Sequence, residues 1–295
     1  MKESISISEK SQQKPNRWLN DYARDVTSQH GEDGIIEKAL EVIGQTNQWC
    51  VEFGAWDGKT LSNTYNLIVN KGYSAVLMES KKKRFNELLS NFQKNQAVIA
   101  INDFVGFEGR NSLDRILQIT PIPVDFDLLS IDVDGCDYHI WEATKHYRPK
   151  IVIIEFNQSI PASVEFVQPR DAHIAQGSSL LSISKLGKTK GYELVCVAGA
   201  NGIFVDSKYF QFFGIEDNSV SEMWTDQSII THIFCGYDGT VFLAGYCKLP
   251  WQDMEFRESR VQQLPAWARR RIGDRNIIRR KFGKIYRHLR KRNII

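Results

Sequence analysis

A chain of 295 residues, 42% hydrophobic and 25% charged, is long enough to bury a sizeable core without disulfides or structural metals. No apolar run reaches the roughly 18 residues of a membrane span, and the polar start lacks the apolar centre of a signal peptide, so we expect a cytoplasmic protein. The five cysteines are scattered and never form a Cys-x-x-Cys pair. This favours reduced, mostly buried thiols over a disulfide framework or a zinc ribbon.

Charge is unevenly distributed, although the net charge is only +3. Residues 265–295 contain twelve Lys or Arg and one acid, which gives this tail a charge of +11. The other 26 basic and 34 acidic residues leave the rest of the chain at −8. The sequence therefore predicts an acidic body that carries a basic tail.

Apolar runs and helical patterns alternate along the first half of the chain. A helical pattern over 18–44 has a polar start at 28–34. Strands are then predicted at 49–53, 74–78, 97–101, 126–131 and 150–154, with helices at 61–71, 81–92 and 111–119. This alternation predicts an α/β fold with a doubly wound, mostly parallel sheet that has helices on both faces.

The second half of the chain continues this pattern and then departs from it. A helix is predicted at 176–191, two antiparallel edge strands at 192–197 and 202–205, and a hairpin at 233–246 around Asp238-Gly239. From Ile278 onward, apolar residues recur at helical spacing among Lys and Arg, which predicts a basic amphipathic helix. We expect four parts: an N-terminal segment (1–48), a ligand-binding domain (49–215), a hairpin-containing extension (216–264) and the basic tail (265–295).

The first strand runs into a glycine turn, Glu52-x-Gly54-x-x-x-Gly58. Glycines without side chains let a ligand lie against bare backbone, although such a turn can also be purely structural. The spacing differs from the Gly-x-Gly-x-x-Gly of dinucleotide folds. Because the strand itself contains an acid, it disfavours a pyrophosphate and suits a positively charged ligand such as S-adenosylmethionine.

Polar residues also end the second and third strands. Glu79 is placed to accept hydrogen bonds from two ribose hydroxyls, with helix capping as the alternative. Asn102-Asp103 stands where a side chain commonly meets an adenine edge, and an ordinary turn explains it about as well.

The fourth and fifth strands end in acids. Asp132, Asp134 and Asp137 follow the fourth strand, and like charges there raise one another's pKa unless a cation or proton offsets them. Glu155 and Asn157 follow the fifth strand. Because parallel strands gather their carboxyl ends at one edge, we expect these groups to lie side by side.

Together these stretches resemble the class I S-adenosylmethionine-dependent methyltransferases, and among them the FkbM-like branch common in bacterial polysaccharide gene clusters. The matching residues are 28–34, 51–58 with 61–64, 129–135 with 137–138, 154–157, and 201–205. The resemblance implies a Rossmann-like, seven-stranded sheet with one reversed strand. It also implies that the cofactor binds over the tips of the first and second strands.

Carried onto this sequence, the resemblance implies specific cofactor contacts. The methionine end would be lined by Glu52, Gly54, Asp57 and Gly58. Glu79 would lie at the ribose, Asp103 at the adenine, and Asp132 below the methyl group. The cofactor-binding residues would also include Ala55, Asn63, Ser80 and Phe104. Trp56 is bulky where the family has small residues, so it either roofs the site or packs under the first helix.

Methylating a sugar hydroxyl requires a general base or a metal, because an aliphatic hydroxyl is a poor nucleophile at neutral pH. Asp134, Glu155 and Asn157 are hard oxygen ligands that suit Mg²⁺ or another divalent cation. Alternatively, Asp134 acts as the base without metal and Glu155 pairs with a Lys or Arg. His173, in a long loop, is a second candidate base, whereas His139 is expected to be packed.

We therefore expect an O-methyltransferase that acts on a sugar hydroxyl of a surface polysaccharide or its lipid-linked precursor. Rival functions are methylation of a small secondary metabolite or a nucleic acid, and a non-catalytic binding module with the same fold. The tail predicts peripheral attachment to an anionic membrane surface, with docking on the acidic body as the alternative. Nucleic acid is a weaker candidate because no aromatic platform accompanies the charge. No oligomeric state is predicted.

Overall fold

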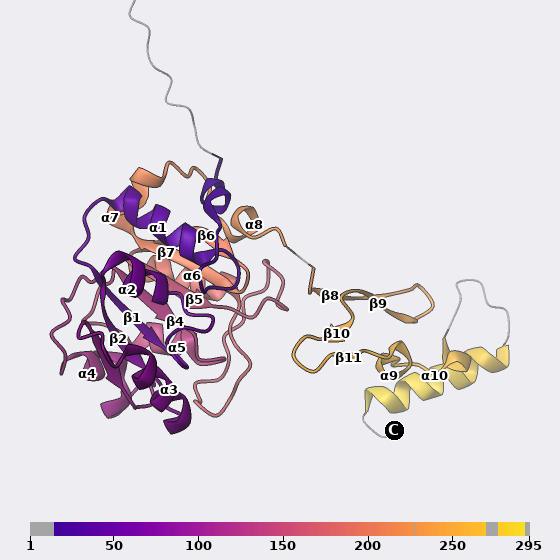
Figure 1. Ribbon diagram of the computed structural model, residues 1–295. Coiled ribbons are helices and arrows are strands. Elements are labelled where there is room, and N and C mark those ends of the chain that lie inside the picture. Colours follow the sequence, from indigo (N-terminus) through magenta and orange to yellow (C-terminus); the bar gives the residue numbers. More distant parts are fainter. Residues whose placement is uncertain (1–14, 227, 270–276, 293–295) are drawn as a thin grey trace, which may run out of the picture. The chain divides into compact units, whose positions relative to one another are not determined.

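The computed structural model describes residues 15–226, 228–269 and 277–292. The chain divides into two compact units, the first ending at Thr225 and the second beginning at Asp226 (Figure 1). Within the described ranges, no helix combines the length and the apolar character needed to cross a membrane.

The first unit is built on a seven-stranded sheet of order β3-β2-β1-β4-β5-β7-β6 (Figure 1). Its strands are β1 (Trp49–Phe53), β2 (Ser74–Met78), β3 (Val98–Ile101), β4 (Leu128–Ile131), β5 (Ile151–Glu155), β6 (Tyr192–Ala198) and β7 (Asn201–Asp206). The first five strands in this order, β3, β2, β1, β4 and β5, are parallel to one another. β7 is antiparallel to both of its neighbours, β5 and β6. The predicted α/β class, with a mostly parallel sheet and one reversed strand, is confirmed.

Helices connect these strands. They are η1 (Trp18–Tyr22), α1 (Glu32–Ile43), α2 (Tyr65–Lys71), α3 (Lys82–Phe92), η2 (Gly109–Asn111), α4 (Leu113–Leu117), α5 (Asp137–Ala143), α6 (Leu180–Thr189), α7 (Ser207–Phe210), η3 (Gln211–Phe213) and α8 (Val220–Met223). The chain moves from β1 to β2 in one direction along the sheet and from β4 to β5 in the other. Right-handed crossovers therefore place α2 and α3 on the opposite face from α5 and α6.

The core lies on both faces of the central strands. Every residue of β4 is buried, and so are four of the five in β5. Trp141 of α5 is fully buried, with its ring 5.1 Å from that of Phe204 in β7. Continuous apolar strands of this kind are typical of a parallel sheet covered on both faces.

The helix predicted over 18–44 is interrupted in the structure. η1 ends at Tyr22 and α1 begins only at Glu32. Between them, the buried carboxylate of Asp33 accepts hydrogen bonds of 2.8–2.9 Å from the backbone N–H groups of residues 26–28. The prediction was wrong over this segment because Asp33, in the first turn of α1, satisfies donors that a helix would otherwise use.

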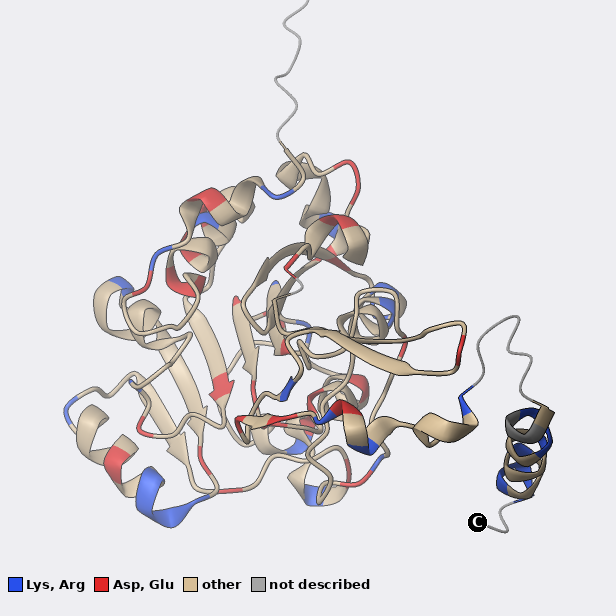
Figure 2. Ribbon diagram, turned by 90° about the vertical axis from the view of Figure 1, so that its right-hand side faces the viewer, with Lys and Arg blue, Asp and Glu red and all other residues tan. Residues whose placement is uncertain are grey.

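The second unit contains the predicted hairpin and helix. Its elements are β8 (Thr231–Cys235), β9 (Val241–Gly245), β10 (Lys248–Leu249), β11 (Met254–Glu255), α9 (Glu258–Val261), η4 (Ala266–Ala268) and α10 (Ile277–Lys291). β8 pairs antiparallel with β9, and Asp238 closes the turn by accepting the N–H of Thr240 at 2.9 Å. In Figure 2, α10 carries Lys and Arg and no Asp or Glu.

All five cysteines are free thiols. Cys50, Cys136 and Cys196 are buried in the first unit, whereas Cys235 and Cys247 of the second unit have access to solvent. The prediction of reduced, mostly buried thiols is confirmed.

Candidate functional site

A cavity of about 490 Å³ opens at the carboxyl ends of β1, β2, β4 and β5. Most of the residues proposed from the sequence line it: Glu52, Gly54, Ala55, Asn63, Glu79, Ser80, Asp103, Phe104, Asp132, Asp134 and Glu155. They come from six separate segments of the chain. The parallel sheet brings them together because the strands end at the same edge.

Gly54 lets the tips of β1 and β4 approach closely. Its φ is +71°, and a Cβ placed on it would lie 2.0 Å from the carbonyl oxygen of Asp132. Any side chain would therefore meet the backbone of the neighbouring strand as well as strain its own. The glycine is required by the fold at this point and also leaves the cavity open.

Glu52 organises the segment that follows the turn. Its buried carboxylate accepts hydrogen bonds from Ser62 Oγ (2.6 Å), Thr64 Oγ1 (2.7 Å) and the backbone N–H of Asn63 (2.9 Å). Burial raises the pKa of Glu52, and these hydrogen bonds oppose the rise. Residues 62–64 are held over β1 in this way, which is why α2 begins at Tyr65 rather than at the predicted 61.

Glu79 and Trp56 form the next part of the wall. The carboxylate of Glu79 accepts the backbone N–H groups of Trp56 (3.1 Å) and Lys81 (2.6 Å). The indole of Trp56 lines the cavity, is 37% exposed, and lies under the guanidinium of Arg84 at 4.2 Å. Of the two alternatives for Trp56, this arrangement corresponds to a side chain at the cavity mouth. Its φ of +49° is unusual for a bulky residue.

Asp103 and Phe104 lie beyond β3. Oδ1 of Asp103 accepts the N–H of Phe104 at 2.8 Å and the amide of Asn111 at 2.9 Å. The ring of Phe104 is 43% exposed. A flat apolar ring beside a carboxylate suits the face and the amino edge of a nucleobase.

Asp57 and Gly58 lie outside the lining of the cavity. Asp57 accepts the N–H groups of Lys59 (2.9 Å) and Thr60 (2.7 Å), so its carboxylate stabilises the turn. A Cβ on Gly58 would lie 2.6 Å from the ring of Phe92. Both residues therefore shape the turn, whereas the sequence resemblance assigned them to the cofactor.

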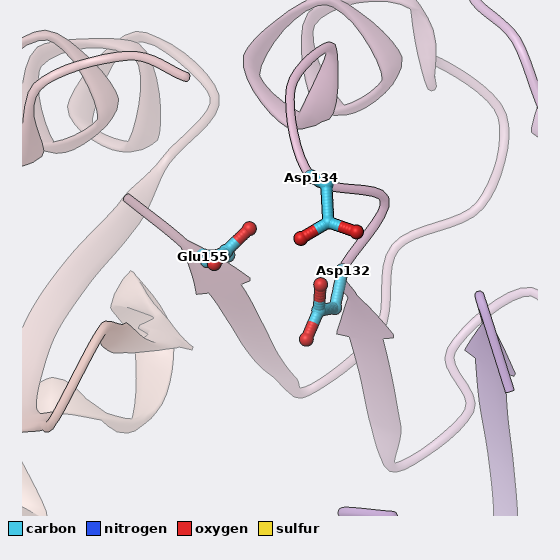
Figure 3. A group of neighbouring side chains, drawn as sticks. All are labelled: Asp132, Asp134 and Glu155. Carbon is cyan, nitrogen blue, oxygen red and sulfur yellow. The ribbon is translucent and has the colours of Figure 1, made fainter. Parts of the chain in front are cut away.

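Asp132, Asp134 and Glu155 form a cluster of acids in the lining of the cavity, with their side chains turned toward one another (Figure 3). One carboxylate oxygen from each lies within 4.8 Å of the others. Asp134 has a φ of +59°, and backbone strain of this kind is concentrated at functional sites. Among the described residues, no Lys, Arg or His forms an ion pair with any of the three.

The close spacing changes the ionisation of this acid cluster. Asp132 is exposed at the cavity, although protein atoms crowd around its side chain. Desolvation by these atoms, with the neighbouring charges of Asp137 and Asp134, raises the pKa of Asp132 to about 7. Desolvation and the charge of Asp132 raise the pKa of Glu155 to about 9. The cluster therefore favours binding a cation or retaining protons at neutral pH.

The donor set of the acid cluster fits a hard divalent cation such as Mg²⁺, which prefers carboxylate oxygens. Its membership differs from the predicted one. Oδ1 of Asn157 accepts the N–H (2.9 Å) and Oγ (2.6 Å) of Ser159, and its amide donates to Gln176 O at 2.8 Å. Asp132 belongs to the acid cluster, whereas Asn157 is absent from the lining of the cavity.

The histidines are arranged differently from the expectation. His173 is exposed in its loop and is absent from the cavity lining. His139 is packed as expected, with Nε2 2.9 Å from Gln168 O. His30 does line the cavity, and the absence of a Cβ at Gly199 makes room for its ring. Its position in the polar stretch 28–34 was the available signal for this residue, but helix capping explained that stretch equally well.

No family model and no curated protein matches this chain. Solved structures with similar folds include the N-terminal domain of EvdMO1, determined in the presence of SAH and D-fucose (10% identity, 59% of this chain, 82% of that chain, TM-score 0.40). Another is a SAM-dependent methyltransferase from Aquifex aeolicus (13% identity, 58% of this chain, 87% of that chain, TM-score 0.35). A third is M. capricolum TrmK in complex with SAH (13% identity, 57% of this chain, 66% of that chain, TM-score 0.34). Similarity at this level does not identify a reaction, which has to be inferred from the cavity itself.

Proposed function

We propose that the chain is an S-adenosylmethionine-dependent methyltransferase that transfers the methyl group to a hydroxyl oxygen. The observation that carries this proposal is one cavity in which acids of two kinds meet. Glu52 and Glu79 are held rigidly by hydrogen bonds beside the glycine turn, whereas Asp132, Asp134 and Glu155 lack cationic partners among the described residues. The first group suits a cationic, hydroxyl-bearing cofactor, and the second suits activation of an acceptor.

The wall between β1 and β3 supports the cofactor assignment. S-adenosylmethionine, when bound, supplies an electrophilic methyl group on a positively charged sulfur. The acids of this wall attract that charge and the amino group of the cofactor. Glu79 retains acceptor capacity for ribose hydroxyls, and Phe104 with Asp103 presents a face and an acceptor to adenine.

The acid cluster supports the acceptor assignment. A divalent cation bound by Asp132, Asp134 and Glu155 would supply a Lewis acid that lowers the pKa of an acceptor hydroxyl. Without a metal, the carboxylate of Asp134 can take up the hydroxyl proton as the oxygen–methyl bond forms and the sulfur–methyl bond breaks. His30, on the same cavity wall, is a further group able to hold that proton.

We propose a sugar hydroxyl, on a surface polysaccharide or its lipid-linked precursor, as the acceptor. Two features favour such a substrate over a small apolar metabolite. The acid cluster presents several acceptors to a polyhydroxylated ligand, and the resemblance to the FkbM-like branch points the same way. In this role His30 and the acid cluster would orient the sugar.

The test is calorimetric titration of S-adenosylmethionine and S-adenosylhomocysteine, with and without Mg²⁺, into the full-length protein. Wild type should bind both ligands, and Glu79→Gln should bind at least about tenfold more weakly because a ribose contact is altered. Glu87→Gln is the matched control, because Glu87 is an exposed glutamate of α3 away from the cavity lining. If wild type binds neither ligand, the methyltransferase proposal fails.

The acceptor is tested separately with methyl-labelled S-adenosylmethionine. Label should appear in a glycan fraction, and Asp134→Asn should lose most of that transfer while it keeps cofactor binding. Transfer only to RNA, or only to small metabolites, would replace the sugar by one of its rivals. Retained transfer by Asp134→Asn would remove the acid cluster from the reaction.

A further inference from the structure

The C-terminal helix α10 has a composition that sets it apart from the rest of the chain. Residues 277–292 include eight Lys or Arg and no Asp or Glu. Phe282, Ile285 and Leu289 follow one another at spacings of three and four residues and therefore share one face of the helix. We call these three residues the apolar stripe.

A different face of α10 contacts the rest of its unit. Gly283 is buried against Ala268, and the guanidinium of Arg287 donates to Ala268 O at 3.4 Å. The ring of Tyr286 lies 5.3 Å from that of Trp267. At 100° per residue, the centre of this contact face lies roughly 120° around the helix from the apolar stripe.

Two of the three residues of the apolar stripe, Phe282 and Ile285, are exposed, and Leu289 is half-buried. Phe282 is 61% exposed and Ile285 is 56% exposed, in a helix whose contact with η4 is made elsewhere. Exposed basic residues lie on the same helix, including Lys281 beside the stripe and Lys284 further around it. Exposed apolar side chains on a strongly basic helix suit a partner that is both apolar and anionic.

We propose that α10 lies in the surface of an anionic membrane, with the apolar stripe in the acyl boundary and the Lys and Arg side chains among phosphate headgroups. The apolar side chains are then removed from water while the basic side chains contact anionic groups. A nucleic acid would meet the positive charge but leave Phe282 and Ile285 in water. Docking of an acidic protein surface would leave them there as well. The membrane is therefore the partner that the whole helix fits.

This binding requires neither cofactor nor acceptor, so it stands apart from the proposed methyl transfer. If the acceptor is a glycan on a lipid carrier, the helix would raise the local concentration of the enzyme at its substrate. Vesicle binding and S-adenosylmethionine binding can then fail or succeed independently of each other.

The test is cosedimentation of the full-length protein with vesicles of phosphatidylglycerol and phosphatidylcholine in equal amounts. Wild type should partition onto these vesicles, and should bind pure phosphatidylcholine at least about tenfold more weakly, because the electrostatic attraction is then lost. The double variant Phe282→Ser/Ile285→Ser should partition at least about tenfold more weakly onto the anionic vesicles. High salt should weaken binding of wild type.

Ile119→Ser is the matched control, because Ile119 is 81% exposed and lies in the first unit. It removes one exposed apolar side chain outside α10 and should leave partitioning unchanged. Since Phe282 and Ile285 are both exposed, the double variant should keep the wild-type melting temperature and its affinity for S-adenosylmethionine. Wild type that stays in the supernatant overturns the proposal. So does a double variant that partitions like wild type, or a protein that binds RNA but not anionic vesicles.

Discussion

Glu52 and Glu79, on the side of the cavity formed by β1 and β2, differ from Asp134 and Glu155, on the side formed by β4 and β5, in what surrounds their carboxylates. The first two accept five hydrogen bonds from their own chain. The acids at β4 and β5 have no ion-pair partner among the described residues. The acids at β1 and β2 are therefore held in place by the fold, whereas those at β4 and β5 have charges that a bound ligand could neutralise.

This difference explains why one cavity can perform two tasks. An acid that is already hydrogen-bonded holds its position and presents a fixed charge to a cofactor. Acids that repel one another are stabilised when a cation or proton binds, so the free energy of the folded protein depends on that binding. Variants on the two sides should thus fail in different ways.

The largest expected effect is at the junction of the two sides. Gly54→Ala should lower the free energy of unfolding by about 4 kcal/mol, because the new Cβ meets the Asp132 carbonyl and the backbone is strained. Gly72→Ala is the control, since Gly72 has nearly the same φ (+73°) but no described heavy atom within 4 Å of the added Cβ. It should cost about 1 kcal/mol. Urea unfolding measures both, and equal losses would show that the close approach is unimportant.

Removing a satisfied acid should be the next most damaging change. Glu52→Ala leaves three buried donors at residues 62–64 without their acceptor and should lower the free energy of unfolding by about 3 kcal/mol. Glu87→Ala, at an exposed site on α3, should change it by less than about 0.5 kcal/mol. Urea midpoints that coincide for the two variants would contradict the pre-organised role of Glu52.

Removing an acid that has no cationic partner among the described residues should stabilise the protein at neutral pH rather than destabilise it. The folded-state pKa of Glu155 lies above its ordinary value, so the fold favours the protonated form; that contribution is complete below about pH 4.5 and is lost as pH rises toward 9. In EDTA, wild type should therefore lose more thermal stability than Glu155→Gln between about pH 5 and about pH 8. Mg²⁺ should restore the melting temperature of wild type more than that of the variant. If the melting temperatures of wild type and Glu155→Gln changed equally with pH in EDTA, ionisation of Glu155 would not destabilise the fold.

The smallest effect is expected at the cavity mouth. Arg84→Ala removes the cation over the Trp56 ring and should weaken S-adenosylmethionine binding by about 1 kcal/mol or less, a few-fold in Kd, because the indole loses its anchor. Lys83→Ala, one residue earlier on the same helix and exposed, should bind like wild type. Calorimetry on the two variants decides whether the stacked pair has a role in binding.

The sequence by itself determined the parallel strands, the antiparallel pair at the sheet edge, the turn at Gly54, the hairpin and the amphipathic helix. Each of these depends on patterns within a few residues, such as apolar periodicity or a glycine at a turn. The site residues at strand ends followed from the same patterns, because a parallel sheet gathers its carboxyl ends at one edge.

Only the tertiary structure decided which of these polar residues stabilise the fold and which remain able to bind a ligand. Asp57 satisfies its own turn, Asn157 binds Ser159, and Asp132 joins the acid cluster instead. His30 reaches the cavity because Gly199, far along the chain, makes room for its ring. Asp57 and Asn157 are held by hydrogen bonds within three residues, and apolar periodicity does not predict the turn geometry that forms them. The positions of Asp132 and His30 depend on segments tens to hundreds of residues away, which local patterns do not encode.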